Sequence, residues 1–120
     1  INGFEALLNQ NNTRILKFFL HISPEEQRQR FKDRQRDPAK HWKLAAGDFA
    51  ERQLWDQYVR AYEAMLSPTS TPANPWHIIP ADHKWVRDYH IAGCVARALA
   101  EMNPRPPKIA NKALITRTFK

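Results

Sequence analysis

Hydrophobic residues form two short runs in this chain, and helical patterns surround them. Residues 15–22 (ILKFFLHI) are almost continuously apolar and lack the alternation of a half-exposed strand, so they predict a strand covered on both faces. A second short strand is predicted at 76–79, and a helix at 2–9 precedes both strands. Buried strands of this kind belong to parallel sheets, so the order of the elements indicates an α/β fold with right-handed crossovers.

Helix signals follow the first strand directly. Ser23 is expected to be an N-cap, with Pro24 at the first helical position and Glu26 closing a capping box. This helix should end by Asp37, because Pro38 disfavours helical geometry in the residue before it.

Two further helices with apolar stripes are predicted. The first begins at Asp48, which is expected to form a capping box with Glu51, and runs to about Leu66. Its stripe comprises Leu54, Tyr58, Ala61, Tyr62 and Met65. The second follows Asp82, its expected N-cap, and stops at Asn103. Its stripe comprises Trp85, Tyr89, Ala92, Val95, Ala96, Leu99 and Met102. Two strands are too few for a stable parallel sheet, so the missing strands are expected from sequence outside this chain or from another chain.

Composition restricts the function classes. The 120 residues carry a net charge of +7 and a pI near 9.9, which favours acidic partners. The single cysteine excludes an internal disulfide, and the five histidines show no metal-binding spacing. The longest apolar run is too short to span a bilayer and contains Lys17 and His21, so a soluble, cytoplasmic protein without a membrane partner is expected.

Positive charge is concentrated after the first strand. Between residues 28 and 43, seven basic residues stand against two acidic ones, which leaves five of the seven net charges in this segment. A field of that density suits a polyanion, and phosphate is the commonest one in biology. On composition alone, a solvated helix surface with salt bridges to Glu26, Asp33 and Asp37 explains the same residues equally well.

Many short segments carry a family resemblance. They are Ile15 to Ser23, Glu25 to Arg28, Arg30-Phe31, Arg34, Asp37-Pro38, Lys40, Trp42-Lys43, Glu51-Arg52, Leu54 to Asp56, Tyr58, Ala61 to Glu63, Thr69 to Thr71, Pro75-Trp76, Ile79 to Asp82 and Lys84-Trp85. Together they resemble the polyphosphate kinase 2 family over residues 1–107, whereas the basic tail 108–120 has no counterpart.

The resemblance implies a fold and an activity. The fold is the C-terminal part of a P-loop kinase, similar to thymidylate kinase: three layers, with parallel strands, flanking helices and a helical lid at about 23–47. The activity is transfer of a phosphoryl group between inorganic polyphosphate and a nucleoside mono- or diphosphate, assisted by Mg²⁺. The implied partners are polyphosphate, AMP, ADP and ATP. A homo-oligomer is also expected, because exposing half of a sheet core drives association, and specific nucleic-acid binding is not expected.

The resemblance also implies two groups of site residues. A lid that closes over polyphosphate would use Arg28, Arg30, Arg34, Lys40 and Lys43. The nucleotide side would use Pro80, Ala81, Asp82 and Lys84. For Asp82, capping of the last helix is an equally good interpretation.

A glycine-rich phosphate-binding loop is absent from the sequence, whose three glycines are scattered at Gly3, Gly47 and Gly93. The resemblance places that loop and the metal-binding acids upstream, so no catalytic or metal-ligating residue is assigned here. The chain alone is therefore expected to be inactive. Two rival hypotheses remain: a non-enzymatic basic module that binds polyanions or nucleic acid through charge, and a dimerisation module.

Overall fold

The structure, a computed structural model, describes residues 1–108 of the chain. Its elements are α1 (Asn2–Gln10), β1 (Lys17–His21), α2 (Pro24–Arg36), the 3₁₀-helix η1 (Pro38–Lys43), α3 (Ala46–Arg52), α4 (Trp55–Thr69), β2 (Trp76–Pro80) and α5 (Lys84–Met102). The predicted tail 108–120 lies, from residue 109 on, outside the described residues. The predicted α/β class is confirmed.

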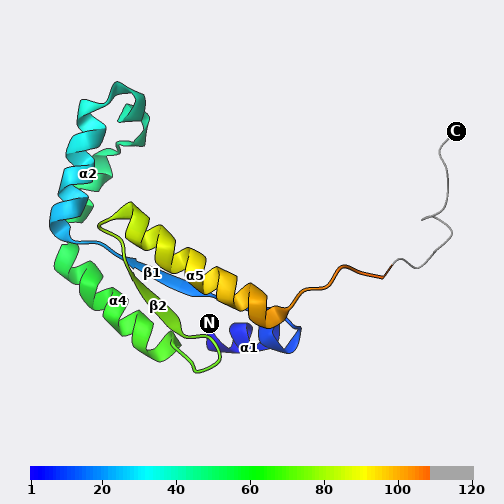
Figure 1. Ribbon diagram of the computed structural model, residues 1–120. Helices are drawn as coiled ribbons and strands as arrows, with labels where there is room; N and C mark the ends of the chain where they lie inside the picture. Colours follow the sequence, from blue (N-terminus) through cyan, green and yellow to red (C-terminus); the bar gives the residue numbers. More distant parts are fainter. Residues whose placement is uncertain (109–120) are drawn as a thin grey trace, which may run out of the picture.

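Strands β1 and β2 pair in parallel, with Lys17 opposite Trp76 and His21 opposite Pro80. Helix α4 lies against the face that carries Phe19, whose ring centroid is 5.0 Å from that of Tyr62. Helix α5 covers the opposite face, so the two helices enclose the strand pair as outer layers (Figure 1). Among the described helices, none has the length and apolar character needed to cross a membrane.

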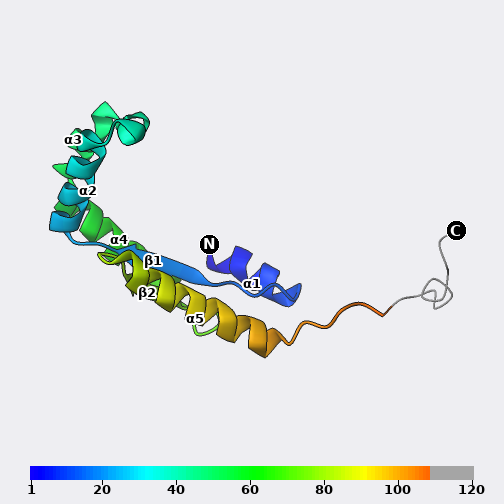
Figure 2. The same cartoon turned by 45° about the horizontal axis from the view of Figure 1, so that its top comes forward.

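The segment between the strands forms an arm. Helices α2, η1 and α3 project away from the strand pair, and α4 then returns along it (Figures 1 and 2). The rings of Phe31 and Phe49 stack at 6.2 Å and hold α2 against α3. The described residues have a radius of gyration of 21.6 Å, against about 13 Å expected for a compact domain of this size. The shape is therefore extended.

Local sequence explains most of the helix boundaries. The Ser23 hydroxyl accepts a hydrogen bond from the Glu26 amide, and Asp37 ends α2 in an extended conformation, as predicted. Only half of the predicted capping box forms, because the Glu26 carboxylate binds Arg30 instead. Helix α5 ends as predicted, at Asn103, which adopts φ 44°.

The predicted helix from Asp48 to Leu66 is in fact two helices. Helix α3 begins at Ala46, before the predicted start at Asp48. Asp48 lies in the first turn, where its carboxylate accepts a hydrogen bond from the Ala45 amide. The Leu54 amide bonds back only three residues, to Glu51, which closes the last turn of α3 and lets the chain bend before α4. The prediction of one continuous helix was wrong at this bend.

The predicted apolar stripes are largely uncovered. On α5, Trp85 and Tyr89 are each 73% exposed, and on α4 Tyr58 and Tyr62 are more than 40% exposed. The buried hydrophobic residues are few: Ile79, Ala81 and Ala98. The stripes follow helical spacing as expected, but residues 1–108 cover them only in part: Tyr62 contacts Phe19 of β1, whereas Trp85 and Tyr89 stay largely exposed.

A buried ion pair joins α1 to the strand pair. The Lys17 ammonium lies 2.8 Å and 3.0 Å from the two carboxylate oxygens of Glu5, and both side chains are only 9% exposed. Lys17 also donates to the Thr69 carbonyl and lies 5.2 Å from the centre of the Trp76 ring. The Trp76 indole in turn donates to the Thr69 hydroxyl. One lysine thus connects α1, the end of α4 and both strands.

Removing one partner of this pair should be costly. Glu5→Ala leaves a buried ammonium without its counter-charge and is expected to lower the free energy of unfolding by about 3 kcal/mol. The matched control is Glu101→Ala, which breaks the exposed Arg14–Glu101 pair and should cost less than about 1 kcal/mol. Urea unfolding of the two variants measures both. Equal losses would contradict the central place given to Lys17.

Candidate functional site: a cationic arm and the loop after the second strand

Parallel pairing brings two predicted site segments to the same end of the sheet. The arm leaves β1 through Ile22 and Ser23, and the predicted nucleotide-side residues follow β2. The Ala81 amide donates to the His21 carbonyl at 2.8 Å. The arm and the loop after β2 therefore begin side by side, directly beyond this hydrogen bond. In open α/β sheets, ligands bind beyond the carboxyl ends of the strands. This edge is the candidate site.

The loop at this edge combines one buried residue with exposed neighbours. Ala81 is only 1% exposed, whereas Pro80 ends β2 and is exposed. Asp82 is half-buried, and Lys84 is exposed at the first position of α5.

Asp82 does not cap α5, so that interpretation was wrong. The N-cap of α5 is His83, without a side-chain hydrogen bond, because the Asp82 carboxylate turns to the arm and accepts the Ser23 amide at 2.7 Å. This hydrogen bond, helped by the nearby charges of His83 and Arg30, holds the pKa of Asp82 below its usual value. Asp82 therefore joins the loop to the first residue of the arm.

The five predicted lid residues separate into two places. Arg28, Arg30 and Arg34 lie on α2. Lys40 and Lys43 lie on η1 at the far end of the arm, three residues apart, which places them on one side of a 3₁₀-helix. The structure thus spreads the predicted lid along the arm.

Arg28 and Arg34 differ in their surroundings. Arg28 is exposed and makes no ion pair within residues 1–108. The Arg34 guanidinium lies 5.4 Å from the centre of the Phe31 ring, which fixes its stem while leaving its donors available.

Lys40 and Lys43 are exposed but have neighbours. Lys40 pairs with Asp37 at 2.7 Å, and this hydrogen bond raises the pKa of Lys40 and lowers that of Asp37. The Lys43 ammonium lies 4.9 Å from the ring centre of Trp42, which is 79% exposed. An aromatic ring and two ammonium groups consequently face solvent at the arm's tip.

Arg30 has a different environment from the other four. Its Nε donates to Glu26 at 2.7 Å, and its Nη2 donates to the carbonyls of Ala81 and Asp82 at 2.6 and 3.2 Å. The guanidinium is thus directed at the loop after β2. Arg30 and Arg34 are four residues apart, which predicts a shared helix face but does not reveal this contact with the loop.

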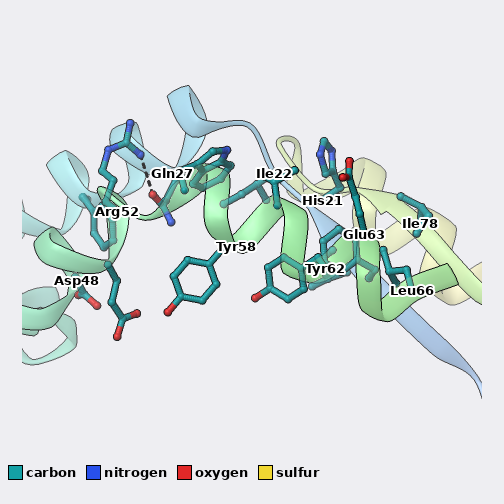
Figure 3. A pocket seen from close by; sticks show the side chains of 16 residues that line it. His21, Ile22, Gln27, Asp48, Arg52, Tyr58, Tyr62, Glu63, Leu66 and Ile78 are labelled. Carbon is teal, nitrogen blue, oxygen red and sulfur yellow. Dashed lines mark hydrogen bonds between the residues drawn. The ribbon is translucent and has the colours of Figure 1, made fainter. Parts of the chain in front are cut away.

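Sequence analysis also missed a cavity beside the arm. A pocket of about 550 Å³ lies between α4, the Phe19 face of β1 and the start of the arm (Figure 3). Tyr58 and Tyr62 line it along α4, and Arg52 closes its end by donating to Gln27 and to the Pro24 carbonyl. The helical spacing of the two tyrosines was visible in the sequence, but it predicted an apolar stripe and not a cavity.

Comparison with known proteins identifies the class. The family Polyphosphate kinase 2 (PPK2) matches residues 1–107. The chain belongs to this family.

Individual relatives agree with this assignment. An AMP/ADP-polyphosphate phosphotransferase of Meiothermus ruber is 45% identical over 118 residues, and an ADP-polyphosphate phosphotransferase of Rhodopseudomonas palustris is 52% identical over 84. A crystal structure of polyphosphate kinase 2 from Arthrobacter aurescens TC1 superposes with a TM-score of 0.88 at 38% identity.

The matches differ in how much of each chain they cover. They include 96%, 70% and 96% of this chain, respectively. This chain spans 44% and 29% of the two relatives and 41% of the solved chain.

The Asp82–Ser23 hydrogen bond predicts a pH dependence. Because the bond favours the carboxylate, its contribution is present above the ordinary pKa of aspartate and is lost as the pH falls below about 4. The Ser23 amide proton shift in NMR spectra should therefore titrate with a midpoint below that value. Asp82→Asn, which cannot titrate, should abolish the step. A midpoint at or above the ordinary aspartate value would contradict the assigned bond.

Proposed function

We propose that this chain forms the lid and the nucleotide side of an enzyme that moves a phosphoryl group between inorganic polyphosphate and AMP or ADP. The proposal includes a P-loop kinase fold similar to thymidylate kinase, with the lid at about residues 23–47. Family membership and the activities for which the relatives are named support it. The observation that carries it is the meeting of a cationic arm and the loop at 80–82 beyond the carboxyl ends of two parallel strands.

The lid would act through three exposed cations and the half-buried Arg34. Arg28, Arg34, Lys40 and Lys43 offer charged donors to a chain of phosphates, and guanidinium forks suit phosphate oxygens. The Lys40–Asp37 pair lies at the surface, where ion pairs are weak, so a polyanion can displace the carboxylate. Closure of such an arm would exclude water and neutralise charge on the transferred group.

The nucleotide side would use the loop and the start of α5. The first turn of α5 carries no acidic residue and no side-chain cap, while Lys84 adds a positive charge there. Uncapped helix amides and an adjacent ammonium attract phosphate. Pro80, Ala81 and Asp82 would then lie beside the base.

The remaining machinery is not among the described residues. No group of three or more His, Cys, Asp or Glu side chains within residues 1–108 is placed to hold a metal ion. The residues present therefore do not fit Mg²⁺, which we assign, with the glycine-rich loop, to the part of the relatives that this chain does not span. On this proposal the chain alone has no transferase activity.

Self-association is part of the proposal. The uncovered stripes of α4 and α5 are large apolar surfaces of the kind buried in subunit contacts, and they support a homo-oligomer. A cytoplasmic location stays a prediction.

Polyphosphate binding tests the lid assignment. The chain is expected to bind fluorescently labelled long-chain polyphosphate saturably, in preference to single-stranded DNA of the same charge. Lys40→Ala/Lys43→Ala should weaken binding at least about tenfold, because two charge-assisted phosphate contacts are lost. Fluorescence anisotropy at low and moderate salt measures both quantities.

The matched control is Arg105→Ala/Lys108→Ala, which removes the same charge far from the arm. Equal affinity for DNA, or an equal loss in the two double variants, would support the rival hypothesis of a generic basic module and contradict a lid.

A further inference from the structure

Arg30 and Asp82 tie the arm to the loop after β2 at two levels. At the base of α2, Asp82 accepts the Ser23 amide. Seven residues further on, about 10 Å along a helix, Arg30 donates to the carbonyls of Ala81 and Asp82. Both links therefore converge on residues 81 and 82, because Asp82 accepts the Ser23 amide with its carboxylate and Arg30 with its carbonyl. We call these two links the clasp.

The contacts of the clasp limit the ability of Arg30 to bind phosphate. The Arg30 side chain is 25% exposed, and its guanidinium already makes three hydrogen bonds, one of them a salt bridge to Glu26. Turning it towards a phosphate would leave the partly buried carbonyls of Ala81 and Asp82 without their donor, which is costly. No such cost attaches to Arg28, which is exposed. The implied role of Arg30 as a phosphate ligand thus conflicts with its observed contacts.

We infer that Arg30 is a positioning residue, and that the clasp couples the nucleotide loop to the lid, so that occupation of one site changes affinity at the other. The inference rests on the proposed function, which supplies the two ligands. A ligand that shifts the loop at 80–82 moves the two carbonyls and the Asp82 carboxylate, and through them the first two turns of α2. Such coupling is reciprocal: polyphosphate on the lid would change nucleotide affinity by the same factor.

The chemistry of the clasp suits arginine. The planar fork satisfies a carboxylate through Nε and two carbonyls through Nη2 at once, whereas a lysine ammonium on a flexible stem does not reproduce that arrangement. Arg30→Lys consequently keeps the charge of the arm and loses the clasp. This substitution distinguishes a role of Arg30 in positioning the loop from a role of its positive charge alone.

The experiment measures the affinity of the whole 120-residue chain for labelled polyphosphate with and without saturating ADP. In the unaltered chain, ADP is expected to change the dissociation constant at least about fivefold. In Arg30→Lys and Asp82→Ala, the factor should fall below about twofold, while affinity without ADP changes little in the lysine variant. The control is Arg36→Gln, an exposed arginine outside the clasp, which should keep the full factor.

A second measurement needs no ligand. Exchange of the Ser23 amide hydrogen, followed by NMR, should accelerate in both clasp variants and stay unchanged in Arg36→Gln. The same ADP factor in all four proteins, or unchanged Ser23 exchange in Arg30→Lys, would overturn the clasp. Loss of polyphosphate affinity in Arg30→Lys without ADP, as large as in Lys40→Ala/Lys43→Ala, would return Arg30 to the phosphate ligands. If the unaltered chain binds no polyphosphate, the proposed function fails with the coupling, while Ser23 exchange still decides the contacts.

Discussion

The parallel register of β1 and β2 is the constraint on which the rest of the structure depends. It places His21 beside Pro80, so the chain leaves both strands at the same edge. A shift of one residue would turn Phe19 away from α4 and separate the Ala81 amide from the His21 carbonyl. The Lys17–Glu5 pair secures the opposite end of the same strand. The arm and the loop can meet only because this register holds.

The cationic side chains of the arm occupy two kinds of environment: Arg30 binds groups of the protein, and others are exposed to solvent. Arg30 is turned inward to carbonyls and a carboxylate, where it shapes the site without facing solvent fully. Lys40, Lys43 and Arg28 are exposed, so on the proposed function these three would meet the polyanion. The net charge of residues 28–43 therefore overstates the number of side chains that are available to bind phosphate. A basic helix is better described by the partners of each guanidinium than by its composition.

Sequence predicted most of the helices and both strands, but not the contacts between elements distant in the chain. The apolar run at 15–22 and the Ser23–Pro24 signal are local, so β1 and the start of α2 were predicted closely. Asp82 was ambiguous, because a cap and a contact with Ser23, 59 residues away, require the same residue type. The apolar stripes predicted α5 closely and α3 and α4 as one helix, and they did not show that much of each stripe is exposed, since periodicity shows which face is apolar and not what covers it.

Mapping polyphosphate on the chain by NMR tests the central claim most directly. Titration into isotopically labelled protein is predicted to shift backbone and side-chain signals of residues 28–43 first, with smaller changes relayed to 80–84. Shifts spread over all basic residues, Arg14 and Arg60 included, would contradict the account. They would show that the arm has no special affinity for phosphate and that its charge acts only as part of a generally basic surface.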